Sequence, residues 1–468
     1  MKQSKFNFTF LDDAGDLIAY NFLRGLQSLS VVSKLYAGEF NKIVDDECIL
    51  LDEKLPYYGA KKLMLELGLL VREDEDEDAY YNSLFYERVY ENTLQLFILP
   101  TEDCDFGCKY CFESFDKPRT CIPKDAQNNL VKFVQKNISR YTKLSVSWFG
   151  GEPLCASETI EYLSKHFNNI CDGKKVQYVA DIVTNGYNLT PDMFDMLYNA
   201  KVYRYQVSVD GLKARHDSQR VRKDGSGSFD RIVSNLLHIK NSKKYKFANI
   251  IVRVNVTRGV LSEIDEFIEF YNENFADDSR FVSQFMPTGN PSLLHDDDDI
   301  FKNERYLNKD DYLEYYQYEN IIYNNDKYRN AMINLNMKSE SLVPMYALCR
   351  ATQKNFFTLT PDLNVYKCYV LFDEPENRLG FINDRGDMVL DETANRRWHS
   401  KKELTQRCRS CYYLPCCNRG NCPYQCNWHP GRFDECIADE PEQMASKLKQ
   451  DILSVMNVYP CSTIEFES

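Results

Sequence analysis

Short apolar runs alternate with longer amphipathic segments from residue 94 onward. Runs of about four to eight apolar residues fit buried strands, and segments with an apolar residue every three or four positions fit helices. Six strands are expected, at residues 94–99, 144–149, 177–183, 203–209, 250–257 and 281–286. This alternation predicts an α/β fold built as a partial (β/α)6 barrel, with functional groups gathered at the carboxyl ends of the strands.

The first 92 residues have a different pattern. Phenylalanine and polar residues alternate over residues 6–10 (FNFTF), which predicts a strand, and residues 16–22 fit its hairpin partner. Apolar residues share one face of a predicted helix at 57–67. The acidic run at 73–78 (EDEDED) is expected to be a solvated linker. These features predict a small α+β domain ahead of the barrel.

The remaining residues divide by composition. An acidic and aromatic stretch, which is expected to form a bridging helical region, is followed by a cysteine-dense segment and then by a helical tail. The expected segments are an N-terminal domain at 1–92, the barrel at 93–290, the bridging region at 291–346, the cysteine-rich domain at 347–440 and the C-terminal helix and tail at 441–468.

Composition restricts the compartment and the partners. The 468 residues include 17 cysteines, but the chain opens MKQSKFNFTF, with no apolar signal core, and has no transmembrane run. We therefore expect reduced thiols in the cytoplasm. The net charge of −13 provides no general attraction to nucleic acid or to an anionic membrane, so neither is expected as a partner. A peptide partner is more compatible with this charge.

Three cysteines form the most informative motif. Cys104, Cys108 and Cys111 have Cys-x3-Cys-x2-Cys spacing, so one short loop can direct three thiolates at a common centre. A [4Fe-4S] cube needs four outer ligands, and a loop that supplies three leaves one iron open to a small molecule. An open metal position indicates chemistry rather than structure. Half of a zinc site is the alternative.

This loop resembles the signature of the radical S-adenosylmethionine (SAM) superfamily, including the aromatic residues Tyr110 and Phe112. The resemblance implies an enzyme in which the amino and carboxylate groups of SAM chelate the open iron. One reducing electron then cleaves SAM to a 5'-deoxyadenosyl radical, which abstracts a hydrogen atom from the substrate.

Motifs after the next three strands resemble the SAM contacts of that superfamily. Glycines of a GGEP motif let the backbone approach a ligand, and the guanidinium of Arg220 suits the SAM carboxylate. His216 and Asp217, just before it, fit equally well as cap or turn residues. The resemblance implies SAM contacts at Tyr110, Gly150, Gly151, Glu152, Pro153, Thr184, Asn185, Ser208, Asp210 and Arg220.

The cysteine-dense segment resembles the SPASM extension of radical SAM peptide-modifying enzymes, which binds two auxiliary [4Fe-4S] clusters. The resemblance implies three clusters in total. When the SPASM ligand pattern is matched residue by residue to this sequence, it implies Cys349, Cys368 and Cys422 as ligands of the first auxiliary cluster. It implies Cys408, Cys411, Cys417 and Cys436 as ligands of the second.

Two features depart from the SPASM pattern, and a further residue differs from the sulfatase-maturing relatives. Leu363 replaces the usual glycine, and the step from Cys417 to Cys422 is one residue longer, so Cys416 or Cys426 could substitute as a ligand. Asn355 stands where sulfatase-maturing relatives have a further cysteine. The first auxiliary cluster would then have an open iron, where a substrate thiolate could bind.

The N-terminal domain resembles the winged-helix-like domains that hold a leader peptide along a strand edge in radical SAM peptide maturases. A structural cap over the barrel is the alternative.

The leading hypothesis is a radical SAM/SPASM oxidoreductase that installs a crosslink, above all a cysteine thioether, in a ribosomally made precursor peptide with a leader. A flavodoxin or ferredoxin is the expected reductant. An anaerobic sulfatase-maturating, formylglycine-generating enzyme and a carbon-carbon crosslinking maturase are the alternatives. Against sulfatase maturation, Tyr369 replaces the aspartate thought to act there as base. A non-catalytic barrel that carries zinc-ribbon binding modules is an alternative from a different class, that of binding proteins rather than enzymes.

Overall fold

The computed structural model describes residues 1–46, 49–111, 120–288, 342, 344, 349–400, 406–417, 424, 428, 441–456 and 459–466. The chain divides into two compact units. The terminal unit contains Met1–Tyr90, Asn336–Gln353 and Trp398–Ser468, and the barrel unit contains Glu91–Leu335 and Lys354–Arg397. Almost all of the expected bridging region at 291–346 lies outside the described residues, as do Phe112, Cys422, Cys426 and Cys436.

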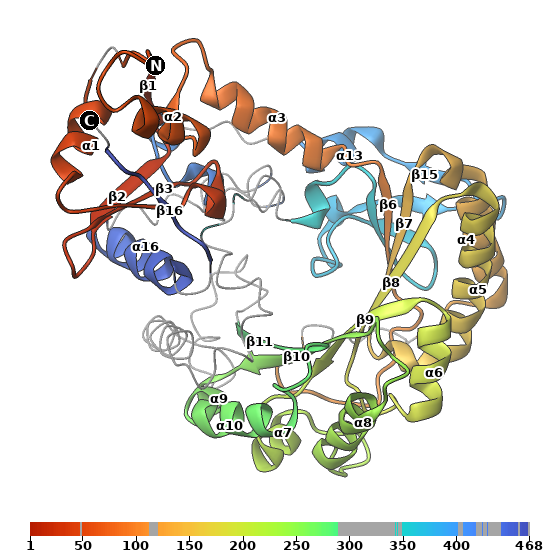
Figure 1. The fold of residues 1–468 in the computed structure, drawn as a ribbon. Helices are drawn as coiled ribbons and strands as arrows, with labels where there is room; N and C mark the ends of the chain where they lie inside the picture. The colour runs from red at the N-terminus through yellow and green to blue at the C-terminus, as the bar shows by residue number, and fades with distance from the viewer. Residues whose placement is uncertain are drawn as a thin grey trace. The chain divides into compact units, whose positions relative to one another are not determined.

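The barrel unit is built on a curved sheet whose first six strands are parallel and follow one another in chain order (Figure 1). They are β6 (Thr93–Ile98), β7 (Lys143–Trp148), β8 (Gln177–Thr184), β9 (Val202–Ser208), β10 (Asn249–Val256) and β11 (Phe281–Pro287). All six expected strands are therefore present, each within one residue of its expected bounds.

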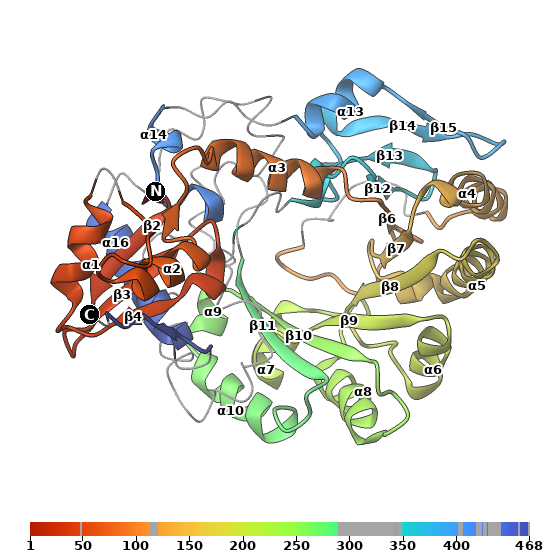
Figure 2. The ribbon, with the colours of Figure 1, turned by 45° about the horizontal axis from the view of Figure 1, so that its top comes forward.

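Amphipathic helices cover the outer face of this sheet (Figures 1 and 2). Ile160, Leu163 and Phe167 of one helix are fully buried at helical spacing, and burial of each such side chain contributes about 2 kcal/mol. The helices are α4 (Lys124–Asn137), α5 (Ser157–Lys174), α6 (Pro191–Asn199), α7 (Lys213–Gln219), α8 (Phe229–Asn241), α9 (Arg258–Leu261) and α10 (Ile264–Asn274).

The sheet continues past β6 into a later part of the chain. Strand β12 (Phe356–Leu359) pairs in parallel with β6, and β13 (Asn364–Tyr366), β14 (Arg378–Ile382) and β15 (Met388–Leu390) extend the sheet as antiparallel neighbours. The cysteine-dense segment expected at 347–440 is consequently divided, because backbone pairing with β6 holds its middle part in the barrel unit. Two short helices follow these strands in the chain, α13 (Glu392–Trp398) and, in the terminal unit, α14 (Gln406–Arg409).

The terminal unit is a four-stranded sheet between two helical layers. Its strands lie in the order β16 (Ser462–Thr463), β4 (Ser30–Val32), β3 (Leu17–Asn21) and β2 (Asn7–Leu11). Alternate side chains of β3 enter two cores, one shared with α1 (Ala37–Val44) and α2 (Tyr58–Glu66) and the other with α16 (Pro441–Met456). Residues 1–92 are therefore packed against the end of the chain, and the expected boundaries at 92 and 441 separate segments that share a core.

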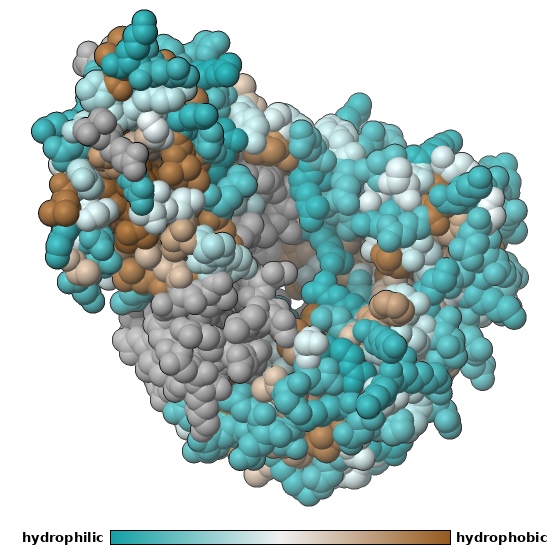
Figure 3. All heavy atoms as spheres, in the orientation of Figure 1, coloured by the Kyte–Doolittle hydropathy of each residue, from teal (hydrophilic) through white to brown (hydrophobic). Residues whose placement is uncertain are grey.

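Apolar side chains also reach the surface of this unit. On the face shown in Figure 3, hydrophobic residues gather over the terminal unit, whereas the barrel unit presents mostly hydrophilic ones. Leu35 is 76% exposed and Leu50 is 59% exposed. None of the helices in the described ranges combines the length and the apolar character that a membrane span requires.

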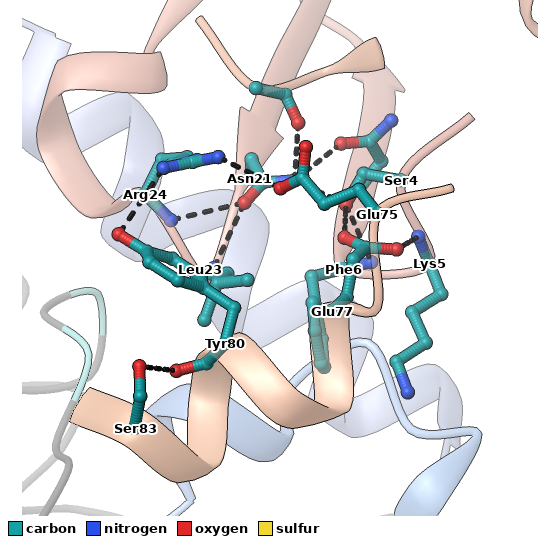
Figure 4. Close-up of polar contacts among 12 residues, drawn as sticks. Ser4, Lys5, Phe6, Asn21, Leu23, Arg24, Glu75, Glu77, Tyr80 and Ser83 are labelled. Carbon is teal, nitrogen blue, oxygen red and sulfur yellow. Dashed lines mark hydrogen bonds and ion pairs between the residues drawn. The ribbon is translucent and has the colours of Figure 1, made fainter. Parts of the chain in front are cut away.

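The acidic run at 73–78 leads into a helix: Glu73, Asp74 and Asp76 are exposed, as expected of a solvated linker, but Glu77 is buried in the first helical turn (Figure 4). The Asp76 side chain caps α3 (Glu77–Val89) by accepting hydrogen bonds from two backbone nitrogens of its first turn. The buried Glu77 carboxylate accepts hydrogen bonds from Ser4 Oγ and, at 3.1 Å, from the backbone nitrogen of Lys5. These contacts tie α3 to the short ladder of β1 (Lys2–Gln3) and β5 (Leu70–Val71).

Candidate active site

The three signature cysteines lie on the loop that follows β6, at the carboxyl edge of the sheet. Cys104 Sγ accepts a hydrogen bond from the backbone nitrogen of Phe106 at 3.4 Å, and the backbone nitrogen of Cys111 donates to Cys108 O at 3.2 Å. Burial raises the pKa of the Cys104 and Cys108 thiols. An all-sulfur donor set within eight residues fits an iron-sulfur cluster. Within the described ranges, no three potential ligands already converge on one point.

The cysteine loop is hydrogen-bonded to the last residue of α7 and to the segment that follows it. The backbone nitrogen of Gly107 donates to Val221 O at 2.7 Å, and the backbone nitrogen of Lys109 donates to Gln219 O at 3.0 Å. Asn185, just after β8, adds a side-chain contact, because its Nδ2 donates to Asp105 Oδ1 at 2.7 Å. The loop is thus held from two neighbouring parts of the carboxyl edge.

The two glycines of the GGEP motif lie against the cysteine loop. A Cβ at Gly150, whose φ is +110°, would lie 2.3 Å from Thr101 O, and a Cβ at Gly151 would lie 2.4 Å from Asp103 O. The sequence suggested that these glycines admit a ligand, and the structure adds a contact that the sequence did not reveal. Their lack of side chains lets the β7 turn touch the backbone beside Cys104.

Glu152 joins the tips of β7 and β8. Its buried carboxylate accepts hydrogen bonds from Thr184 Oγ1 and the backbone nitrogen of Asn185, both at 2.6 Å, and from the backbone nitrogen of Leu154 at 3.1 Å. Burial raises the pKa of Glu152 to about 7, although the three hydrogen bonds favour the charged form. Pro153 begins the short 3-10 helix that follows, Pro153–Ala156.

A second buried polar group centres on Tyr110. Its hydroxyl donates to Asp210 Oδ2 and accepts from Arg220 Nη1 at 2.6 Å and from Asn255 Nδ2 at 3.1 Å. The Arg220 guanidinium, which is 7% exposed, pairs with Asp210 at 3.6 Å. Burial raises the pKa of Tyr110 well above its ordinary value, so the hydroxyl stays protonated. Asn255 was not identified from the sequence. Its position near the carboxyl end of the expected strand at 250–257 could have suggested a role in the site.

His216 and Asp217 have structural positions. His216 Nδ1 accepts from the backbone nitrogen of Asp210 at 3.1 Å, and its Nε2 lies 3.1 Å from Ser228 Oγ. Burial lowers the pKa of His216 to about 3, so the ring is neutral. Asp217 accepts from the backbone nitrogens of Ser228 and Phe229 at the start of α8. Ser208 is the buried last residue of β9.

Residues 98–270 match the family model described as Radical SAM superfamily. The chain carries a radical SAM domain. Proteins of this superfamily use a [4Fe-4S] cluster and SAM, and the three cysteines and the two polar groups described above all lie in the matched segment.

Curated relatives match between about a third and two thirds of the chain. Radical SAM cyclopropyl synthase TigE of Paramaledivibacter caminithermalis is 30% identical over 191 residues, which are 37% of this chain and 39% of TigE. A cysteine-type anaerobic sulfatase-maturating enzyme of Clostridium novyi is 24% identical over 357 residues, which are 70% of this chain and 87% of that enzyme. Mycofactocin maturase MftC of Mycolicibacterium smegmatis is 28% identical over 201 residues, 42% of this chain and 46% of MftC.

A solved structure agrees with the fold. It is described as native anSMEcpe with bound AdoMet and Cp18Cys peptide, and it has a TM-score of 0.58 and 19% identity over 78% of this chain and 97% of that chain. At this identity, the likeness concerns the fold alone.

The cysteines expected to bind auxiliary clusters fall in both units. Cys368 follows β13 in the barrel unit, and Cys349, Cys408, Cys411 and Cys417 belong to the terminal unit. Cys416, which was the possible substitute ligand, is fully buried in the core, with its Sγ 3.6 Å from Phe22 O, whereas Cys417 is half-buried.

Cys408 and Cys417 both lie within electrostatic range of Tyr81. Both act electrostatically on the hydroxyl of Tyr81, whose pKa is raised chiefly by burial and further by these thiols. The backbone nitrogen of Cys411 donates to Cys408 O at 3.2 Å, which places a third thiol in the same turn. Cys436, the expected fourth ligand, lies outside the described residues.

The loop that carries Cys368 is organised by two residues. Leu363 adopts the left-handed conformation, with φ +59°, in the turn between β12 and β13, so it takes the backbone geometry for which glycine is usual. The fully buried Asn377 side chain makes hydrogen bonds to the backbone of Lys367, Cys368 and Leu371. Asn377 was not identified from the sequence, because a single asparagine belongs to no motif that would indicate a structural role.

Asn355 and Tyr369 are the two residues at which the sequence was expected to differ from sulfatase-maturating enzymes. Asn355 Nδ2 donates to Glu91 O at 3.1 Å, beside the start of β6. The Tyr369 ring stacks on Phe97 at 4.6 Å and meets Phe149 edge-on at 5.7 Å. Tyr369 therefore makes aromatic contacts with β6 and with the residue after β7.

Proposed function

We propose that this protein is a radical SAM/SPASM peptide maturase, an oxidoreductase that installs a crosslink in a ribosomally synthesised precursor peptide. The observation that carries the proposal is the meeting of three motifs at one carboxyl edge: the loop of Cys104, Cys108 and Cys111, the glycine turn with Glu152, and the buried group around Tyr110. When bound, the cluster and SAM supply a 5'-deoxyadenosyl radical that removes a hydrogen atom from the substrate.

The residues of the edge have separate roles in this proposal. Cys104, Cys108 and Cys111 hold the cluster. Arg220 binds the SAM carboxylate: its guanidinium is buried beside Tyr110, and its Nε has no hydrogen-bond partner within the described part of the chain. Asp210 balances the guanidinium charge, so the site does not carry an unpaired buried cation before SAM binds. The GGEP turn, Pro153 included, and the tips at Thr184, Asn185 and Ser208 complete the SAM site.

We propose a cysteine thioether as the crosslink. Two positions support this choice over formylglycine formation. Tyr369 supplies a ring stacked on Phe97 rather than a carboxylate, so this position lacks a base near neutral pH. Asn355 supplies an amide bound to Glu91 O, so the first auxiliary cluster would take only Cys349, Cys368 and Cys422. The second auxiliary cluster would take Cys408, Cys411, Cys417 and Cys436.

Sulfatase maturation is the second candidate, because the match to the Clostridium novyi enzyme extends over 87% of that enzyme. A carbon-carbon crosslink is a further variant of the maturase proposal. Mass spectrometry of a treated cysteine peptide separates the candidates. A thioether or a carbon-carbon crosslink removes two hydrogen atoms, and iodoacetamide still labels the cysteine only in the second case. Formylglycine formation instead replaces the thiol group by an aldehyde oxygen.

The proposal also names the partners. The substrate is a precursor peptide with a leader, the reductant is a flavodoxin or ferredoxin, and the compartment is the cytoplasm. Three [4Fe-4S] clusters require ~12 iron per chain, whereas zinc-ribbon modules require none, so metal analysis separates these readings.

The experiment that tests the radical SAM assignment replaces Cys104, Cys108 and Cys111 by alanine. We expect the reconstituted variant to lose 5'-deoxyadenosine formation under dithionite and about a third of its iron, and to retain the auxiliary clusters. Formation of 5'-deoxyadenosine at the parent rate in the triple variant would overturn the assignment.

A further inference from the structure

The buried ion pair of Arg220 and Asp210 is not closed. Arginine and a carboxylate usually meet through two parallel hydrogen bonds with N···O distances of about 2.7–2.9 Å. Here Nη1 of Arg220 lies 3.6 Å from Oδ2 of Asp210, although the two side chains are only 8% and 0% exposed. The Arg220 side chain donates instead to the Tyr110 hydroxyl at 2.6 Å, and its buried Nε has no partner within the described ranges. Most N–H groups of the guanidinium are therefore left for another acceptor.

Asn255 occupies the other oxygen of the Asp210 carboxylate. Its backbone nitrogen donates to Oδ1 at 2.8 Å, and its side-chain Nδ2 donates to the same oxygen at 3.2 Å. The backbone ladder between β9 and β10 reaches its end just before, where the nitrogen of Val209 donates to Arg253 O at 2.8 Å. The carboxylate thus provides the next acceptor for β10, and it could turn toward Arg220 only by giving up bonds from Asn255.

Asn255 also completes the hydrogen bonding of Tyr110. Its Nδ2 donates to the hydroxyl oxygen at 3.1 Å, and Arg220 Nη1 donates to the same oxygen. The single hydroxyl hydrogen goes to Oδ2 of Asp210. Because a phenol has one hydrogen to donate and two lone pairs, this hydroxyl has no capacity left for a ligand. A ligand at this place would have to bind the guanidinium.

The orientation of the Asn255 amide is fixed from the opposite side. Arg253 Nε donates to Asn255 Oδ1 at 3.2 Å. A flipped amide would turn its oxygen toward the Asp210 carboxylate and its N–H groups toward a donor, so both sides favour the observed orientation. The backbone of Asp210 is held as well, since its nitrogen donates to His216 Nδ1 at 3.1 Å. The carboxylate is therefore fixed at both of its ends.

We infer that Asn255 is a positioning residue that keeps the Arg220 guanidinium open to a carboxylate ligand. It does so by holding one oxygen of Asp210 and one lone pair of Tyr110. Without the amide, Asp210 would turn its second oxygen to Arg220 and close the pair as a two-bond fork, the geometry that such pairs prefer. The ligand is the carboxylate of SAM, so the inference rests on the proposed function and adds the residue that maintains this subsite.

The test compares two ligands that differ only in the carboxylate, SAM and decarboxylated SAM. Both are titrated into the reconstituted full-length holoenzyme by anaerobic calorimetry without a reductant, so SAM is not cleaved. Asn255→Leu removes the amide and keeps the backbone N–H that bonds to Asp210. This variant should bind SAM about thirtyfold more weakly, because Asp210 then competes with the ligand for charge-assisted hydrogen bonds. Its affinity for decarboxylated SAM should equal that of the parent.

Further variants control for packing and for the route of the effect. Asn255→Ala removes the amide without the bulk of leucine and should behave alike. Asn137→Leu replaces a half-buried asparagine of α4, whose Nδ2 donates to Phe133 O at 2.8 Å, and should bind both ligands like the parent. Arg220→Met with Asn255→Leu should bind SAM no more weakly than Arg220→Met alone, since Asn255 acts through Arg220. Thermal unfolding of every variant checks that it folds.

Each other outcome overturns a distinct statement. Parent-like SAM affinity of both Asn255 variants, together with weaker binding by Arg220→Met, would refute the inference and leave the proposed carboxylate contact intact. An equal loss of affinity for SAM and decarboxylated SAM would reduce Asn255 to a structural role. Parent-like SAM affinity of Arg220→Met would overturn the proposed carboxylate contact and the inference with it. A parent protein that binds SAM and forms 5'-deoxyadenosine but modifies no peptide would refute the peptide substrate alone.

Discussion

The side chain of Asn377 is hydrogen-bonded to both backbone polar groups of Cys368: its Oδ1 accepts from the backbone nitrogen of Cys368 at 2.7 Å, and its Nδ2 donates to Cys368 O at 2.8 Å. The same amide also accepts from the backbone nitrogen of Lys367 and donates to Leu371 O, so all its hydrogen-bonding capacity is used within one loop. Because Asn377 is fully buried, no water replaces these bonds.

Replacement of Asn377 by aspartate should therefore destabilise the protein by about 3 kcal/mol. The carboxylate keeps both acceptor contacts but turns two donor contacts into repulsion between oxygens, and it buries a charge. Urea unfolding of the apoprotein measures the loss, and iron analysis after reconstitution should show that the cluster at Cys368 is depleted. Asn128→Asp is the control, since its exposed Oδ1 only accepts from Tyr162 and remains able to do so. Equal stability of the two variants would contradict the role of Asn377.

The tight approach of Gly150 to the cysteine loop gives a second prediction. In Gly150→Ala the new Cβ would lie 2.3 Å from Thr101 O, a backbone atom, and the positive φ adds strain. We expect a loss of about 3 kcal/mol or more in unfolding free energy and less iron at the signature cysteines, because Thr101 must move.

Gly173→Ala provides the matched control for this substitution. Gly173 lies within α5 and a Cβ there would meet no heavy atom within 4 Å, so alanine should stabilise the helix by up to about 1 kcal/mol. Parent-like stability and iron binding of Gly150→Ala would show that the β7 turn is not constrained by the loop.

The buried Glu152 carboxyl predicts a pH dependence of stability. Its folded-state pKa of about 7 lies above the ordinary value of 4.5, so the folded protein binds this proton more tightly than the unfolded chain. The stabilising effect is complete below the unfolded pKa and is lost as the pH rises through 7. Between pH 5 and 8 it should amount to about 2.5 kcal/mol.

Urea unfolding of the parent and of Glu152→Gln at several pH values measures this effect. Glutamine does not titrate, so the difference in unfolding free energy between parent and variant should fall by about 2.5 kcal/mol from pH 5 to pH 8. A difference independent of pH would mean that Glu152 titrates alike in both states.

The sequence predicted the strands of the barrel because its periodicity is local. Each apolar run from 94–99 to 281–286 is flanked by polar residues and followed by a helical pattern, so no distant partner is needed to identify it. The carboxyl-edge motifs followed from the same reasoning. The resemblance located Tyr110, Asp210 and Arg220 before the structure showed their hydrogen bonds.

The hairpin of β2 and β3 was predicted from its local alternation and is confirmed, but the strand that completes the terminal sheet was beyond this reasoning because its partner is far away in the chain. Strand β16 is two residues long and has no recognisable pattern, yet it pairs with β4 more than 400 residues earlier. Asn255 and Asn377 act through side-chain hydrogen bonds that depend on tertiary position alone. The acidic run at 73–78 was predicted correctly only in part, because charge suggested solvent exposure for the whole run, whereas Glu77 is buried and accepts hydrogen bonds from Ser4 Oγ and the backbone nitrogen of Lys5.

Leu363 shows how a departure from a family pattern can leave the backbone unchanged. Its φ of +59° costs a leucine roughly 1 kcal/mol, but the side chain is 2% exposed and its burial contributes about 2–3 kcal/mol. Leu363→Gly removes both effects, so we expect a net loss of about 1–2 kcal/mol in unfolding free energy, with the hairpin of β12 and β13 preserved. Lys175→Gly is the matched control, since Lys175 has φ +57° but is exposed at the end of α5, and glycine there should stabilise the protein by about 1 kcal/mol. Urea unfolding of both variants decides the point: stabilisation of Leu363→Gly as large as that of Lys175→Gly would mean that burial of the leucine does not offset its backbone strain.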